Sequence, residues 1–147
     1  MLKNLLSFLF LDKEIKEDVA FLKKIDSFKM FTVWQLKKIT TILYRRTYSK
    51  NEFIYKKGEP AKIVCLLKSG KIELFDGKSK TIVEINNIFG ERSLLCANDF
   101  YLKDARAIEK SEIYIIHKED LENIMEKDTN IGFKIVKSLL EKIYDKA

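Results

Sequence analysis

The chain has 147 residues, of which 46% are hydrophobic and 34% are charged, and its formal net charge is +6. This length fits one domain around one core, and the composition is typical of a folded protein and excludes a disordered one. The positive charge favours anionic partners such as nucleic acid, an anionic membrane surface or a phosphorylated ligand, although lysines spread along the chain equally serve solubility.

The N-terminal segment, residues 1–12 (MLKNLLSFLFLD), is apolar but too short to span a bilayer. The charged stretch DKEIKED follows it in place of a signal-peptide cleavage site. Two interpretations stay open: a helix packed on the domain or on a second subunit, which we favour, and an interfacial membrane contact. We therefore separate this segment from a domain at residues 13–147.

Two helices are predicted before any strand. Apolar residues at helical spacing predict the first, over residues 13–25: Ile15, Val19, Leu22 and Ile25. Thr32 and Gln35 form a capping-box pattern that begins the second helix. We expect that helix to carry an apolar stripe at Leu36, Ile39 and Leu43, and to end at Arg45 and Arg46, where cations suit the helix dipole.

Short apolar runs between turn signals predict a β-roll over about residues 47–117. The expected strands are 53–56, 63–68, 71–75, 81–85, 106–109 and 112–116. Four of the five glycines fall at the predicted turns between them, where a positive φ is needed: Gly58, Gly70, Gly77 and Gly90.

Helical spacing returns over about residues 118–146 and predicts two C-terminal helices. Leu121, Ile124 and Met125 mark the shorter helix, and Thr129 is the expected cap of the longer one. One edge of the longer helix alternates steps of four and three, as a coiled-coil seam does: Gly132, Val136, Leu139 and Ile143. Either this helix forms a homodimer, or its wide apolar face is buried against the roll.

Two cysteines and one histidine give little support to a disulfide framework or a metal site. Cys65 and Cys96 each lie in an apolar stretch, where a free thiol behaves as a small core residue. His117 has no Cys or His near it in sequence, so we predict no metal. The few, separated cysteines fit a reducing, cytoplasmic compartment. The sequence also shows no nucleophile–base arrangement and no P-loop, so we predict a non-enzymatic protein.

The segment IFGERSLLCANDFYLKDARA, residues 88–107, resembles the phosphate-binding cassette of the cyclic-nucleotide-binding domain family. This family includes the sensor modules of catabolite-activator-type regulators and of cyclic-AMP-dependent kinase regulatory subunits. The matching positions are Phe89, Gly90, Glu91, Ser93, Leu94 and Leu95. The runs KGEPA at 57–61 and LKSGK at 67–71, and the entry helices, also resemble the family. The resemblance implies an α+β fold, an antiparallel double-stranded β-helix (a jelly-roll-like β-roll) with N-terminal helices and two C-terminal helices.

The resemblance also implies a ligand site for a cyclic nucleotide, cAMP or cGMP. Gly90 would let the backbone approach the phosphate, Glu91 would accept the ribose hydroxyl, and Ser93 would add a donor. In the family an Arg holds the cyclic phosphate, but ten residues after Glu91 this chain has Tyr101. Replacing that charged hydrogen bond with a neutral hydroxyl is expected to cost about 1–3 kcal/mol, and Leu102 makes the site more apolar.

The remaining question for this site is whether another cation takes the place of the family's arginine. Lys103, which shares a strand face with Tyr101, and Arg92, inside the cassette, are the candidate substitutes, unless both are solvated surface charges. The expected ligand-binding residues are Phe89, Gly90, Glu91, Arg92, Ser93, Tyr101, Leu102 and Lys103.

Two functions follow. The first is a sensor that binds a cyclic nucleotide or related phosphate ligand and transmits the signal through the last helix to an unknown protein effector. The second is a degenerate member that serves as a dimerisation or interaction module, with the Tyr101 ring filling the vacated site. Catabolite-activator-type regulators carry a helix-turn-helix after the long helix, and this chain stops at Ala147, so we expect no specific DNA binding within it.

Overall fold

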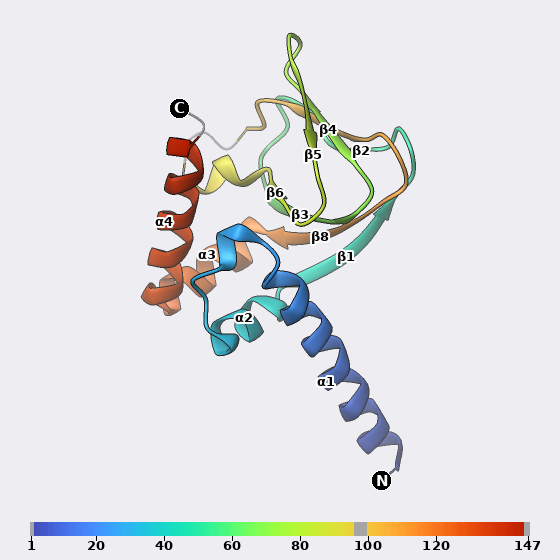
Figure 1. Ribbon diagram of the computed structural model, residues 1–147, viewed down its shortest axis with the longest axis vertical. Helices are drawn as coiled ribbons and strands as arrows, with labels where there is room; N and C mark the ends of the chain where they lie inside the picture. Colours follow the sequence, from blue (N-terminus) through green and yellow to red (C-terminus); the bar gives the residue numbers. More distant parts are fainter. Residues whose placement is uncertain (1, 96–99, 146–147) are drawn as a thin grey trace.

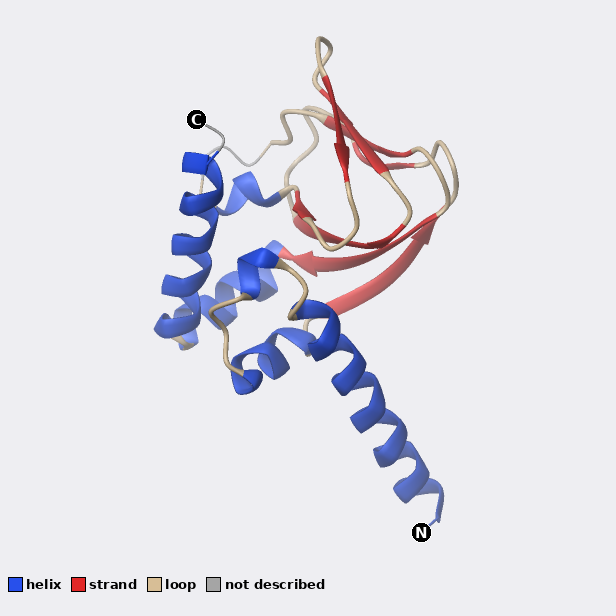
Figure 2. Cartoon of the chain, in the orientation of Figure 1, coloured by secondary structure: helices blue, strands red, loops and turns tan. Residues whose placement is uncertain are grey.

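The computed structural model describes residues 2–95 and 100–145. Two four-stranded antiparallel sheets form a β-roll, and helices from both ends of the chain gather on one side of it (Figure 1, Figure 2). This confirms the predicted fold class. In chain order the elements are α1 Leu2–Leu22, η1 Asp26–Phe28, α2 Val33–Thr40, β1 Leu43–Tyr48, β2 Phe53–Tyr55, β3 Ile63–Ser69, β4 Ile72–Phe75, β5 Lys80–Val83, β6 Ile88–Phe89, η2 Glu91–Leu94, β7 Asp104–Ala107, β8 Ser111–His117, α3 Lys118–Lys127 and α4 Thr129–Asp145.

The helices pack on the sheet with strand order β1-β8-β3-β6, which we call the helix-side sheet. The other sheet, with order β2-β7-β4-β5, is called the outer sheet. Strand β3 is buried on both faces, because Val64 and Leu66 pack among the helices while Cys65 and Leu67 point into the roll. A strand buried on both faces is a continuous apolar run, as the sequence IVCLL is.

Two hydrophobic cores therefore lie on opposite faces of the helix-side sheet. The core under the helices includes residues from α1, α2, α4 and the turn after α1 that are fully or almost fully buried: Leu22, Ile25, Leu36, Ile39, Ile131, Ile135 and Leu139. The core inside the roll lies between the two sheets and includes Tyr55, Cys65, Ile72, Phe89, Tyr101, Ala105 and Ala107. The predicted burial of Cys65 is confirmed, whereas Cys96 lies outside the described residues.

The predicted end of the second helix is wrong. Helix α2 begins at the predicted capping box, in which Thr32 and Gln35 satisfy each other's backbone N–H groups, but it ends at Thr40. Leu43 and both arginines lie in β1, which pairs along its whole length with β8. The run LYRRTY is rich in aromatic and β-branched residues, and pairing with a buried strand outweighs its helical spacing.

The predicted seam of the last helix also needs correction. Gly132 and Leu139 are buried inside the chain, and a Cβ on Gly132 would meet the backbone oxygen of Met125 at 3.0 Å. Of the predicted seam only Ile143 is exposed, and the other exposed large apolar residues of α4 are Phe133, Leu140 and Tyr144. The N-terminal cap is Asp128 and not the predicted Thr129, because the Asp128 carboxylate accepts the N–H of Ile131 at 3.2 Å.

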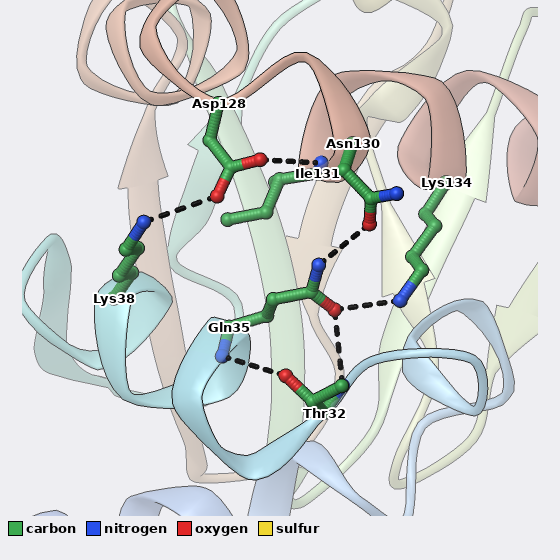
Figure 3. A network of polar contacts seen from close by, with 7 residues as sticks. All are labelled: Thr32, Gln35, Lys38, Asp128, Asn130, Ile131 and Lys134. Atoms are coloured by element: carbon green, nitrogen blue, oxygen red, sulfur yellow. Dashed lines mark hydrogen bonds and ion pairs between the residues drawn. The ribbon is translucent and has the colours of Figure 1, made fainter.

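A polar network joins α2 to the start of α4 (Figure 3). The Gln35 side chain donates to Asn130 Oδ1 at 2.7 Å and accepts from Lys134 Nζ at 2.7 Å, while Lys38 pairs with Asp128 at 3.0 Å. These contacts hold the N-terminal end of α4 against α2, so this end of the helix is fixed on the domain.

Residues 2–12 of the N-terminal segment and the predicted first helix form one continuous helix, α1, whose first turns extend away from the rest of the molecule (Figure 1). This helix ends at Leu22 and not at the predicted Ile25. Leu5, Leu6 and Phe10 are 58–69% exposed, so the expected packing on this chain is not found for these three side chains. Within the described residues, no helix combines the length and the apolar character needed to cross a bilayer.

Candidate functional site

The turn that follows β6 begins the candidate site. Strand β6 pairs with β3, with Phe89 opposite Cys65, and this pairing places the Phe89 ring in the core of the roll. Gly90 follows with φ at +74° and leads directly into η2. A Cβ at Gly90 would lie 3.4 Å from the ring of Tyr55 and 3.5 Å from Ile63 O. These are ordinary van der Waals distances, so the left-handed backbone is what favours glycine at this position.

Tyr101 closes the same end of the roll from the opposite side. Its ring is buried and stacks on Tyr55, with 3.7 Å between centroids and 11° between planes. Its hydroxyl donates to Ile63 O at 2.8 Å and accepts the N–H of Ile63 at 3.1 Å. The hydroxyl hydrogen of Tyr101 is therefore committed to the edge of β3. The turn at Gly90 and Tyr101 meet at Tyr55 and Ile63, two residues that the sequence interpretation did not select.

The backbone around Tyr101 is fixed as well. Its N–H donates to Glu59 O at 3.0 Å, and its carbonyl accepts the N–H of Gly58 at 2.8 Å. These two bonds attach the start of the β7 segment to the connection between β2 and β3. The position of the ring is thus set by the main chain and by the stacking together.

The acidic residue of the cassette contacts the C-terminal helix. Glu91 has a side chain only 16% exposed, and its Oε1 accepts from Lys142 Nζ at 3.0 Å. Lys142 also donates to the carbonyl of Ile88 at 3.1 Å. Figure 1 shows this turn, in yellow, beside the last turns of α4. Lys142 lies 51 residues from Glu91 in sequence, so no local motif indicates the pair.

Three other predicted site residues, Arg92, Leu102 and Lys103, make none of these contacts within the described residues. Leu102 is 59% exposed, and Arg92 is exposed on η2. Lys103 is half-buried, and its charge contributes, after the hydrogen bonds from Ser79 and Lys78, to the lowered pKa of Asp76 at the β4–β5 turn. The side chain of Ser93 lies outside the described residues.

Burial makes the interior of the roll a poor environment for charge. Removal from water is the main cause that raises the pKa values of Tyr55, Tyr101 and Cys65 above their ordinary values. Glu91 also contributes to the upward pKa shifts of Tyr55 and Cys65, which places its charge within electrostatic reach of both. An anionic ligand entering here would therefore meet neutral side chains and one carboxylate that is already paired.

The charged residues of β7 face the opposite way. Arg106 bonds Glu73 at 3.3 Å on the outer face of the outer sheet, where an open cleft of about 250 Å³ lies between Phe53 and Phe75. Ala105 and Ala107 point into the roll, as the alternation of side chains along a strand predicts. Arg106 is therefore not a candidate for the missing cation of the cassette.

Comparison with known proteins agrees with this geometry. Residues 45–128, more than half of the chain, match the family model of the cyclic nucleotide-binding domain. The chain is 29% identical over 108 residues to human cGMP-dependent protein kinase 2, which covers 73% of this chain and 13% of the kinase. It is 28% identical over 105 residues to the anaerobic regulatory protein of Bacillus subtilis, covering 67% of this chain and 44% of that protein. The chain thus spans less than half the length of these relatives.

Solved structures share the fold. A cyclic nucleotide-binding domain from Methylobacillus flagellatus superposes with a TM-score of 0.75 at 17% identity, covering 92% of this chain and 79% of that chain. The regulatory domain of Toxoplasma gondii PKA, solved with cAMP, gives a TM-score of 0.76 at 15% identity, covering 92% of this chain and 51% of that one. At these identities the likeness is one of fold. Together with the family match, the β-roll and the turn at Gly90, it shows that this chain belongs to the cyclic nucleotide-binding domain family.

Proposed function

We propose that this domain is a regulatory sensor that binds a cyclic nucleotide, or a related phosphate ligand, at the cassette and transmits binding through α4. The observation that carries the proposal is the direct bond between Glu91 of the cassette and Lys142 of α4. A ligand that reaches Glu91 would act on a residue already in contact with the C-terminal helix. The similarity to proteins whose names refer to cGMP and cAMP adds support.

The chemistry of the site predicts weak binding. The Tyr101 hydroxyl already donates its proton to Ile63 O, and its ring stacks on Tyr55, so it has no free donor for a cyclic phosphate. Without a charged hydrogen bond from this position, the affinity is expected to fall by about one to two decades relative to a site with arginine.

Isothermal titration calorimetry with cAMP and with cGMP tests the proposal on the wild type and on Tyr101→Arg. We expect weak binding by the wild type and about ten- to a hundredfold tighter binding by Tyr101→Arg, because the variant restores a charged phosphate anchor. Tyr101→Phe is the matched control, since it keeps the ring and adds no charge. The absence of both heat and thermal stabilisation at millimolar nucleotide, in wild type and Tyr101→Arg alike, would refute the sensor function.

A second candidate is an interaction module without nucleotide. It is favoured by the double engagement of Tyr101, whose ring and hydroxyl both serve contacts within the domain. The exposed apolar residues of α4, among them Leu140 and Ile143, supply a face for a second copy of the chain or for a protein effector. Sedimentation equilibrium tests whether the face binds a second copy of the chain. A wild-type dimer that Leu140→Glu converts to a monomer supports the homodimer, and a monomeric wild type argues against it.

We further propose that the domain is non-enzymatic and works in the cytoplasm. The buried, free Cys65 supports a reducing compartment. Incubation with cAMP followed by chromatography tests the first statement, because recovery of unchanged nucleotide is expected and hydrolysis would contradict it.

A further inference from the structure

Helix α4 is held at both ends by different parts of the molecule. Its first turns are bonded to α2, and its buried stripe ends at Leu139. Beyond that residue the apolar side chains are largely exposed: Leu140 at 43%, Ile143 at 42% and Tyr144 at 77%. Lys142 is the residue in these last turns whose side chain, 28% exposed, reaches back to the cassette. The end of α4 thus depends on this one lysine among the contacts that the structure describes.

The ammonium group of Lys142 has a donor to spare. A lysine ammonium carries three N–H donors and no acceptor. Two of them point to Ile88 O at 3.1 Å and to Glu91 Oε1 at 3.0 Å, both at the turn where the cassette begins. The third N–H has no further protein acceptor within the described part of the chain, and it can serve an anion that approaches Glu91.

The charge balance at Glu91 requires such a cation. A cyclic nucleotide brings one negative charge to a site whose own acidic residue, Glu91, has a side chain only 16% exposed, and two like charges at close range repel strongly where little water screens them. Lys142 neutralises Glu91 directly, while Arg92 is exposed and Lys103 acts on Asp76. The cation in contact with the cassette therefore comes from α4.

We infer that Lys142 is a ligand-binding residue of this domain, and that it supplies from the C-terminal helix the positive charge that the family's arginine supplies from the cassette. This inference rests on the proposed function, since it concerns the same ligand. One lysine would then contact both the cassette and the phosphate, so ligand binding would tighten the last turns of α4 on the roll. A monodentate lysine also gives a weaker and less directional grip than arginine.

The test measures cAMP and cGMP binding to Lys142→Met, Lys142→Arg and Lys103→Met. We expect Lys142→Met to lose about ten- to a hundredfold in affinity for both nucleotides, because Glu91 would then face the phosphate unpaired. Lys142→Arg keeps the charge and should stay within about threefold of wild type, and Lys103→Met should bind as wild type does. Adenosine has a ribose but no phosphate, so its affinity for Lys142→Met should be no lower than its affinity for the wild type.

Hydrogen exchange of α4 provides a second measurement on the folded variants. Amides of residues 140–145 should exchange faster in Lys142→Met than in wild type without ligand, and nucleotide should slow their exchange in wild type alone. Lys137→Met, an exposed change on the same helix, is the control and should leave exchange unchanged.

The outcomes separate the two proposals. Equal nucleotide affinity in wild type and Lys142→Met overturns the role of Lys142 while leaving a nucleotide sensor in place, and so does a variant Lys103→Met that loses binding instead. Tighter binding by Lys142→Met would mean that the lysine competes with the ligand, which also overturns the inference. Failure of wild type and Tyr101→Arg to bind any nucleotide overturns the sensor function itself, and the ligand role of Lys142 with it.

Discussion

Replacing Tyr101 with phenylalanine isolates what its hydroxyl contributes to stability. Along β3, Lys62 O accepts from Lys118 N on the β8 side, so the N–H and C=O of Ile63 point to the other side of the strand. There the Tyr101 hydroxyl meets both groups, at 3.1 and 2.8 Å, in the manner of a neighbouring strand. Phenylalanine preserves the stack on Tyr55 but leaves one donor and one acceptor without this partner.

The expected cost is about 2 kcal/mol in the free energy of unfolding, roughly 1 kcal/mol for each backbone group that loses a partner in a half-buried position. For a chain of 147 residues this corresponds to a fall in melting temperature of about 4–8 °C. Thermal and urea unfolding followed by circular dichroism measure both quantities. Tyr44→Phe is the matched control, because Tyr44 is 54% exposed and its hydroxyl has no hydrogen bond within the described residues. If Tyr101→Phe unfolds within about 0.5 kcal/mol of wild type, the hydroxyl does not replace a strand partner and the reasoning fails.

Three further predictions concern the framework. Asp18→Asn should lower the free energy of unfolding by about 2 kcal/mol, measured in urea, because the nearly buried carboxylate accepts a charged hydrogen bond from Arg45 at 2.8 Å; a neutral effect would mean that the pair is dispensable. Gly70→Ala should lower the free energy of unfolding by about 2–4 kcal/mol and Gly77→Ala by about 1 kcal/mol. Both residues have positive φ, but only at Gly70 would the added methyl lie 2.6 Å from a backbone oxygen. Equal melting temperatures of the two variants would contradict this. Burial raises the pKa of Tyr55 above its ordinary 10.0, so its contribution to stability is complete below pH 10 and falls as the pH rises further, when the unfolded tyrosine ionises first; urea titrations above pH 10 should show a shallower loss for Tyr55→Phe.

The features that the sequence predicts well are those set by local chemistry. All four turn glycines have positive φ, and the capping box at Thr32 is formed, because each depends on a few neighbouring residues. The end of α2 could not be predicted in this way, since LYRRTY has both helical spacing and strand composition. Its partner β8 lies about 70 residues further along the chain, and this pairing decides the outcome.

The candidate site divides along the same line. The turn at Phe89, Gly90 and Glu91 is a contiguous motif, and the sequence is enough to find it. The contacts around this turn cannot be found from the sequence in the same way, because Tyr55, Ile63 and Lys142 come from three other elements. Alternation along β2 would have indicated that Tyr55 points inward, but helical spacing alone does not tell which lysine of α4 faces the cassette.

The helix-side sheet has consequences for how the domain unfolds. Strand β3 carries Val64 and Leu66 into one core and Cys65 and Leu67 into the other. If β3 left the sheet, both cores would therefore lose packing at the same time. The helices and the roll are therefore expected to melt in one cooperative transition, with the same midpoint for far-ultraviolet signals from the helices and near-ultraviolet signals from the tyrosines of the roll. If the proposed sensor function is correct, the turn at Gly90 and the body of α4 up to Leu139 both pack on elements bonded to β3, so a signal between them would travel as a shift of intact elements and not by unfolding of either core.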